Sequence, residues 1–217
     1  NITAPSATDN CGISGSVTGT RSDNADLSAA YPVGTTTITW TVSDVNGNDA
    51  VAVTQNVVIS DNEKPVIASV SSINQSADAG LCSAALTINT PSATDNCGIS
   101  GSVVGTRSDN EALSAPFPFG NTTITWTVSD IHGNVADQVQ QVVTITDDEA
   151  PVITLNGNAS VEVWQYNNYT DAGASALDNC NGDVSIDIVV VNPVDVNTPG
   201  VYTVTYNVSD ASFNAAT

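Results

Sequence analysis

The sequence has few basic residues, no methionine and no long apolar run. Lys and Arg together number 3 against 23 Asp and Glu, which leaves a formal net charge of −20 at pH 7. Nucleic acids and anionic membrane surfaces are both bound through clustered cations, so this charge excludes both as partners. No apolar segment approaches the ~20 residues of a membrane span, and we therefore expect no direct membrane insertion by this segment.

Aromatic residues are scarce and no stretch is rich in the helix-forming residues Leu, Glu, Lys and Arg. Thr, Ser, Val, Ala, Asn, Asp and Gly dominate instead, which is a β composition. The four cysteines are well separated and the single histidine is His132, so a zinc site is not indicated. Ser129, Asp130 and His132 share one tight turn and cannot line up as nucleophile, orienting group and base. We expect no catalytic residues.

One hairpin pattern occurs three times. TTITWTVSDVNGN at residues 36–48 recurs as TTITWTVSDIHGN at 122–134 and, more loosely, as YTVTYNVSDASFN at 202–214. Apolar residues alternate with Thr and Ser, which predicts a half-buried strand followed by a tight turn and a return strand. We expect Trp40 and Trp126, on the apolar face, to lie in the core.

The repeat extends well beyond the hairpin. An offset of 86 residues relates Cys11 to Cys97 and Trp40 to Trp126, and PSATDNCGISGSV at 5–17 returns unchanged at 91–103. Such near-identity indicates duplication within a tandem array. We divide the chain into three repeats: a first, incomplete at its start; a second, complete; and a third, divergent and incomplete at its end. These are residues 1–60, 61–146 and 147–217.

The second repeat predicts about seven short strands, which is typical of a two-sheet immunoglobulin-type sandwich. The expected strands are residues 64–70, 81–88 and 99–106, a short one around Phe117 and Phe119, and the hairpin 122–129 with 135–146. The fold class is therefore all-β, with tandem immunoglobulin-like sandwiches in an extended array. We expect the chain to be an interior fragment of a longer polypeptide whose neighbouring repeats are its partners.

Several short elements follow one another in the second repeat: Cys82, Asp95-Asn96-Cys97-Gly98, Phe117-Pro118-Phe119-Gly120, residues 122–128, Asp130, Gly133-Asn134 and Asp147. In this order they resemble the hyalin repeat, an immunoglobulin-like module. The third repeat resembles a bacterial immunoglobulin-like surface domain through Ala150-Pro151-Val152-Ile153, Tyr169-Thr170-Asp171, Gly173-Ala174, Gly182-Asp183 and residues 200–210. Phe213 stands where that family has Gly, so the last turn is expected to differ. Long bacterial adhesins, including gliding-motility adhesins, resemble this acidic, Thr-rich tandem pattern.

The resemblance implies a disulfide between Cys82 and Cys97. The corresponding partner of Cys11 would precede the chain, and Cys180 would be free or paired beyond residue 217. Disulfide use, the absence of methionine and the acidity all favour an oxidising, extracellular location at the cell surface.

Acidic residues gather at the predicted junctions between repeats. Because successive strands alternate in direction, the entering linker, the loop after the second strand and the loop after the sixth strand share one end of a sandwich. One set is Asp61, Glu63, Asp95 and Asp130; the other is Asp147, Asp148, Glu149, Asp178 and Asp210. Converging carboxylates repel unless a cation lies among them, which predicts a structural Ca²⁺ at each junction. The alternative is that these side chains cap turns without metal.

These observations favour a structural and adhesive stalk segment of a secreted or surface-anchored adhesin, with an unknown surface or glycan ligand. The alternative is a non-catalytic spacer or carbohydrate-binding module of a secreted hydrolase. Trp164, near Tyr166 and Tyr169, is the residue on which this alternative depends. We expect Trp164 to pack within the third repeat; an aromatic at a strand edge would instead stack on sugar rings.

Overall fold

The computed structural model describes residues 2–217, and its elements are strands apart from one 3-10 turn at Ser185–Asp187. The all-β prediction is confirmed. The chain divides into two compact units: unit 1 contains Asn1–Lys64 and Ile131–Asn134, and unit 2 contains Pro65–Asp130 and Val135–Thr217. Among the described residues, no helix has the length and apolar character needed to cross a membrane.

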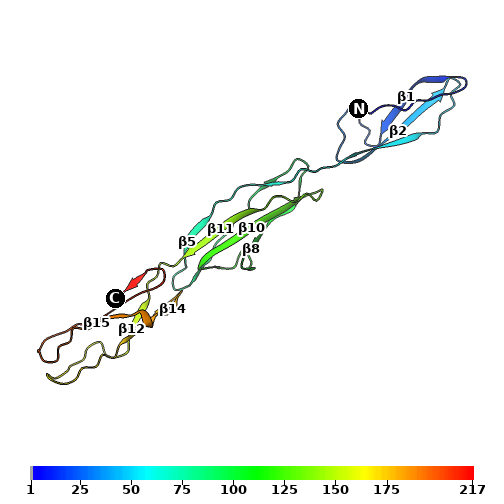
Figure 1. Ribbon diagram of the computed structural model, residues 1–217. Coiled ribbons are helices and arrows are strands. Elements are labelled where there is room, and N and C mark those ends of the chain that lie inside the picture. Colours follow the sequence, from blue (N-terminus) through cyan, green and yellow to red (C-terminus); the bar gives the residue numbers. More distant parts are fainter. Residues whose placement is uncertain (1) are drawn as a thin grey trace. The chain divides into compact units, whose positions relative to one another are not determined.

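Unit 1 is built on one antiparallel sheet of three strands, β1 (Ile13–Arg21), β2 (Gly34–Asp44) and β3 (Val53–Ile59), with β2 in the centre (Figure 1). The alternation in β2 buries Ile38 and Trp40, as predicted. Strands β2 and β3 are therefore the two strands of the first copy of the repeated hairpin.

In unit 2, the second repeat forms a four-stranded sheet in the order β5, β11, β10, β8 (Figure 1). Its strands are β5 (Ile73–Ser76), β11 (Val139–Thr146), β10 (Gly120–Asp130) and β8 (Ile99–Arg107). Strand β10 pairs antiparallel with both neighbours, whereas β5 runs parallel to β11. Two short ladders accompany the sheet: β4 (Val66–Ile67) with β7 (Ala93–Thr94), and β6 (Ser83–Ala84) with β9 (Phe117–Pro118).

The core of the second repeat lies under β10 and β11. Ile124 and Trp126 are fully buried and pack with Phe117, Val143 and Ile145. The indole Nε1 of Trp126 donates to Gln141 Oε1 at 3.3 Å, so the polar tip of this core side chain is satisfied. The prediction that the repeated tryptophans are core residues is confirmed.

Two buried arginines, which the sequence analysis missed, organise the loop before the central strand in each unit. Arg107 donates to Asp109, to the carbonyl oxygens of Ala112 and Ala115, and to Pro116 O at 3.2 Å. Its guanidinium carbon lies 3.8 Å from the ring centroid of Phe117. Arg21 makes the equivalent contacts in unit 1. Neither arginine contributes a basic surface.

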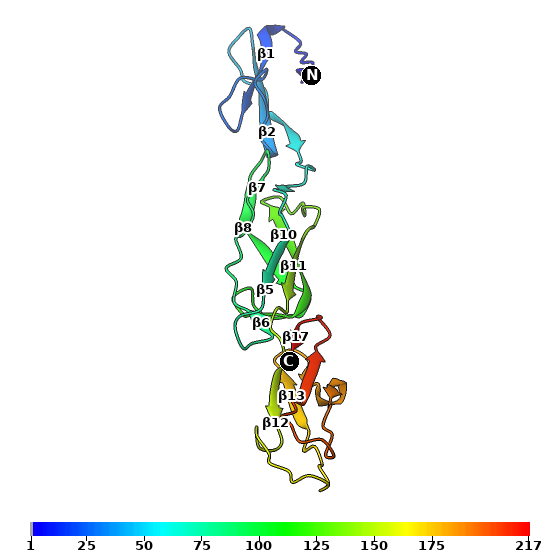
Figure 2. The same ribbon diagram turned by 90° about the vertical axis from the view of Figure 1, so that its left-hand side faces the viewer.

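The third repeat, also in unit 2, has shorter strands in two small sheets. Figure 2 shows β12, β13 and β17 at this end of unit 2. The first sheet contains β12 (Val152–Leu155), β13 (Ala174–Asp178) and β14 (Gly182–Asp183); the second contains β15 (Val189–Val191), β16 (Thr205–Ser209) and β17 (Ala215–Ala216). The buried core is small: Ala176, Val184 and Val208. This repeat therefore depends more on polar contacts than the second.

The turn after β16 has the same Asp to Asn hydrogen bonds as the turn after β2, contrary to the expectation drawn from Phe213. Asn214 N donates to Asp210 Oδ1 at 2.8 Å and Asn214 Nδ2 to Oδ2 at 2.7 Å, as Asn48 does with Asp44 at the same distances. Phe213 adopts φ 68°, in the region that Gly47 occupies at φ 87°. The hydrogen bonds from Asn to Asp thus fix the turn and hold Phe213 in a glycine-like conformation.

Candidate metal centre

A disulfide joins the second and third repeats within unit 2. Cys82 is bonded to Cys180 with the two Cα atoms 4.8 Å apart, across a sequence separation of 98. The expected Cys82 to Cys97 pairing is wrong, and so is the expectation that Cys180 is free or paired beyond residue 217. Beside the bond, Asn179 Nδ2 donates to Leu81 O at 2.9 Å.

The register of β10 explains why the expected pairing fails. Ile99, just after Cys97, pairs with Asp130 at one end of β10. Ser83, just after Cys82, pairs with Pro118, immediately before the other end of β10. The ends of an 11-residue strand lie roughly 30 Å apart, far beyond the reach of a disulfide.

Two of the predicted ligands hold the linker between the repeats instead of joining a cluster. The Asp148 carboxylate accepts from the hydroxyl of Ser76, and also from Thr146 at 3.2 Å. The Glu149 carboxylate accepts from Gly80 N at 2.9 and 3.1 Å. Asp148 therefore fastens the linker to the end of β5, and Glu149 fastens it to the segment that follows β5.

The other three predicted ligands of this junction come together. Asp147 follows β11, Asp178 ends β13 and Asp210 follows β16, and one ligand atom from each lies within 4.8 Å of the others. The three residues are 6%, 5% and 6% exposed, respectively. We call Asp147, Asp178 and Asp210 the aspartate cluster.

Hydrogen bonds through asparagine side chains hold the segments of the cluster together. Asn214 Nδ2 donates to Asp147 O at 3.1 Å as well as to Asp210 Oδ2, which links the linker to the last turn. Asn181 Oδ1 accepts from Ala211 N at 3.2 Å, which links the loop after Asp178 to the same turn. Sequence reasoning missed the role of both asparagines; the Asp-x-x-x-Asn spacing, present in all three repeats, was a usable signal for Asn214 but not for Asn181.

The electrostatics of the cluster are unfavourable without a counter-ion. Burial raises the pKa of Asp147, and the neighbouring Asp178 and Asp210 carboxylates raise it further, while hydrogen bonds from Glu149 N and from the Ser212 side chain oppose the shift. Oδ2 of Asp147 and Oδ2 of Asp178 are buried and have no hydrogen-bond partner among residues 2–217. Oxygen-only donors of this kind suit a hard divalent cation.

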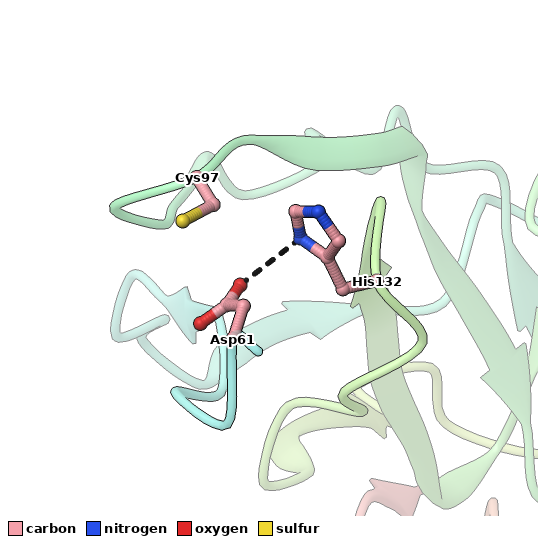
Figure 3. Close-up of side chains that lie close together, drawn as sticks. All are labelled: Asp61, Cys97 and His132. Atoms are coloured by element: carbon pink, nitrogen blue, oxygen red, sulfur yellow. Dashed lines mark hydrogen bonds and ion pairs between the residues drawn. The ribbon is translucent and has the colours of Figure 1, made fainter. Parts of the chain in front are cut away.

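The predicted ligands of the earlier junction are divided between the units. Asp61 and Glu63 belong to unit 1, and Asp95 and Asp130 belong to unit 2, so their joint role stays a prediction. Within unit 1, the His132 ring lies beside the Asp61 carboxylate, with Nδ1 3.2 Å from Oδ2 (Figure 3). Asn134 Nδ2 donates to Asp61 O at 3.2 Å.

The comparisons with known proteins assign both repeats of unit 2. Residues 60–145 match the HYR domain, and residues 153–217 match the Ig-like domain of bacterial surface proteins. The chain contains a HYR domain followed by a bacterial surface Ig-like domain. The HYR domain carries Cys82 and the Ig-like domain carries Cys180, so the disulfide links the two families of module.

Two proteins named hyalin are similar to the chain. Hyalin of Strongylocentrotus purpuratus is 36% identical over 137 residues, which cover 61% of this chain and 11% of that protein. Hyalin of Lytechinus variegatus is 32% identical over 228 residues, which cover 98% of this chain and 40% of that protein. The chain thus spans less than half the length of either relative.

Trp164 does not pack within the third repeat, and that expectation is wrong. Its side chain is 83% exposed, and Tyr166 nearby in the sequence is 73% exposed. Tyr166 adopts φ 68° and its N–H donates to Val196 O at 3.0 Å. The segment between β12 and β13 therefore presents two aromatic rings to solvent.

Proposed function

We propose that this chain is a non-catalytic structural and adhesive segment of a long secreted or surface-anchored adhesin. The HYR and bacterial surface Ig-like matches and the similarity to hyalin support this function. A structural disulfide and an acidic composition support an extracellular location at the cell surface. The partners would be neighbouring repeats and a surface or glycan ligand, and structural calcium at the junctions belongs to the same proposal.

The observation that carries the proposal is the disulfide between the second and third repeats. A force applied to the two ends of unit 2 passes through the bond between Cys82 and Cys180 and bypasses the chain between them. Loop closure over 98 residues also stabilises the folded state by roughly 4 to 5 kcal/mol in the chain-entropy account. A segment built in this way resists extension, which suits a load-bearing stalk.

Single-molecule force spectroscopy on the full chain, pulled from its two ends, tests this role. In the oxidised protein, the extension after complete unfolding should lack the chain between the two cysteines. Addition of a reductant should then lengthen the unfolded chain by about 330 Å, because the bond spans 98 residues. A gain of only about 50 Å, expected for a bond between residues 82 and 97, or no gain would overturn the proposal. Cys180→Ser serves as the control that has the long extension without reductant.

A second candidate function, a carbohydrate-binding module, is favoured by the exposure of Trp164. An exposed indole stacks on the apolar face of a sugar ring. Glycan-array binding by the full chain that is lost in Trp164→Ala and retained in Phe213→Ala, a control with a 90% exposed aromatic, would support it. An array without any bound glycan would count against it.

A further inference from the structure

We infer that Asp147, Asp178 and Asp210 form a calcium site at the junction of the second and third repeats, in which each side chain supplies a carboxylate oxygen. A calcium ion at this site would serve the structural role proposed above, and only this purpose depends on that proposed function. Binding itself depends on the geometry of these three residues and is measured independently of any mechanical property.

The spacing of the cluster fits one ion. Ca²⁺ binds oxygens at about 2.3 to 2.6 Å, so ligands on opposite sides of the ion lie up to about 5 Å apart. The three ligand atoms lie within 4.8 Å of one another and come from three segments far apart in the sequence. An ion held there would tie the linker after β11, the loop after β13 and the turn after β16 to a single point.

The unpartnered oxygens separate this cluster from ordinary turn chemistry. Asp178 Oδ1 accepts from the N–H groups of Cys180 and Asn181 at 2.9 and 2.7 Å, and Asp147 Oδ1 accepts from Glu149 N at 3.2 Å. These bonds account for turn capping but leave Oδ2 of each residue buried without a partner. A buried carboxylate oxygen that has lost its water and gained no donor is costly unless a cation binds it.

No basic side chain of unit 2 is available to balance the cluster. The one Lys or Arg of unit 2 is Arg107, and its guanidinium is occupied by Asp109 and three carbonyl oxygens. Three carboxylates this close repel one another. A divalent cation would remove this repulsion and would also bind the buried Oδ2 atoms of Asp147 and Asp178.

The donor set selects calcium among the common cations. Zinc sites in proteins are built mainly on cysteine and histidine, with a carboxylate as an additional ligand, and the cluster offers neither of the first two. Magnesium demands near-ideal octahedral geometry, whereas calcium accepts irregular sets of six to eight oxygens. Extracellular calcium modules bind with dissociation constants of about 10⁻⁴ to 10⁻³ M, which sets the range for the titration.

The test is calorimetric titration of calcium into the chelator-treated full chain, with thermal melting in calcium and in chelator. We expect heat of binding and a melting transition that rises by roughly 5 to 10 °C at a free calcium concentration about 100 times the dissociation constant. Asp178→Asn keeps the Oδ1 acceptor of the turn and removes the charge, so one binding event and the corresponding part of the melting shift should disappear.

Asp195→Asn is the matched control, because Asp195 is an exposed carboxylate that caps a turn of the same repeat outside the cluster. This variant should bind calcium as the wild type does. Asp147→Asn is the second variant if Asp178→Asn fails to fold, as judged by circular dichroism. The inference is overturned if calcium produces neither heat nor a melting shift, or if a folded cluster variant binds as many ions as the wild type. Neither result would change the outcome of the force-spectroscopy test of the disulfide, so the calcium site and the structural role can fail separately.

Discussion

Phe213 shows how a single hydrogen-bonded pair overrides the preference of the residue beside it. The Asp210 and Asn214 pair closes the turn in the same way as in the first repeat, and Phe213 takes a positive φ that costs a bulky residue roughly 1 to 2 kcal/mol. Its side chain is 90% exposed and gains little packing in return. The turn is thus a local source of strain in a repeat with a small core.

Phe213→Gly should therefore stabilise the third repeat. The substitution relieves the strain of the positive φ, but glycine also gives the unfolded chain more backbone freedom. The net increase in the free energy of unfolding should be about 0.5 to 1 kcal/mol. Differential scanning calorimetry should show a melting point higher by about 1 to 4 °C. Ala211→Gly, in the same turn, is the control and should lower the melting point. A melting point of Phe213→Gly equal to or below that of the wild type would show that Phe213 is not strained.

The Tyr206 and Asp171 pair makes the stability of the third repeat depend on pH. The hydroxyl of Tyr206 donates to the Asp171 carboxylate, which lowers the pKa of Asp171 below its ordinary value of 3.8 and raises the pKa of Tyr206 to about 12. A lowered carboxyl pKa contributes stability that is present above pH 3.8 and is lost as the pH falls through the folded pKa.

Tyr206→Phe should accordingly return the pKa of Asp171 toward 3.8. The melting point of the variant should lie below that of the wild type near pH 7, and the difference should shrink once Asp171 is protonated in acid. NMR titration of the Asp171 carboxyl carbon, together with melting curves at both pH values, measures the two effects. A constant difference across the acid range would show that the variant loses packing alone.

At the scale of the elements, Gly105 and Trp126 explain how β8 packs beside β10. Gly105 of β8 pairs directly with Trp126 of β10, and a Cβ at Gly105 would lie 2.6 Å from Cζ3 of the indole. The indole therefore covers β8 where that strand has no side chain. Unit 1 uses Gly19 and Trp40 in the same way.

Gly105→Ala should destabilise the second repeat by about 1 to 3 kcal/mol, because the indole must move from a filled core. Chemical denaturation followed by tryptophan fluorescence measures the loss. Gly200→Ala is the control, since a Cβ there meets Tyr202 only at 3.7 Å. A Gly105→Ala protein as stable as the wild type would mean that the indole is not confined by β8.

Some elements followed from the sequence and others did not. The strands β8, β10 and β11 were predictable because their apolar residues alternate with a period of two. Strand β5, Ile-Asn-Gln-Ser, has too few apolar residues to show that pattern and depends on its parallel pairing with β11. The hydrogen bonds of Arg107 depend on a loop conformation that residue order does not reveal.

The three aspartates of the candidate site were predictable from the sequence, but the disulfide partner of Cys82 was not. Alternating strand directions predicted that the loops bearing Asp147, Asp178 and Asp210 share one end of the third repeat, and the structure brings these residues together. The disulfide was assigned within one repeat because a resemblance between single modules contains no information on contacts between modules. Only the docking of the Cys180 loop against the second repeat identifies its partner.

At the scale of the whole molecule, the second and third repeats of unit 2 are joined by two kinds of contact. The disulfide lies where the two repeats meet, and so do the hydrogen bonds of Asp148 to the end of β5 and of Glu149 to the segment that follows. A small core such as that of the third repeat gains stability from both of these. Two modules that match different family models thus belong to one compact unit.

Digestion with trypsin before and after reduction tests this covalent junction most directly. After alkylation of free thiols and denaturation, cleavage following Arg107 separates a fragment containing Cys82 and Cys97 from residues 108–217, which contain Cys180. The two fragments should run as one species by mass spectrometry until a reductant is added, because Cys82 is bonded to Cys180. Release of residues 108–217 without reductant would show that this bond is absent and that the second and third repeats are not covalently joined.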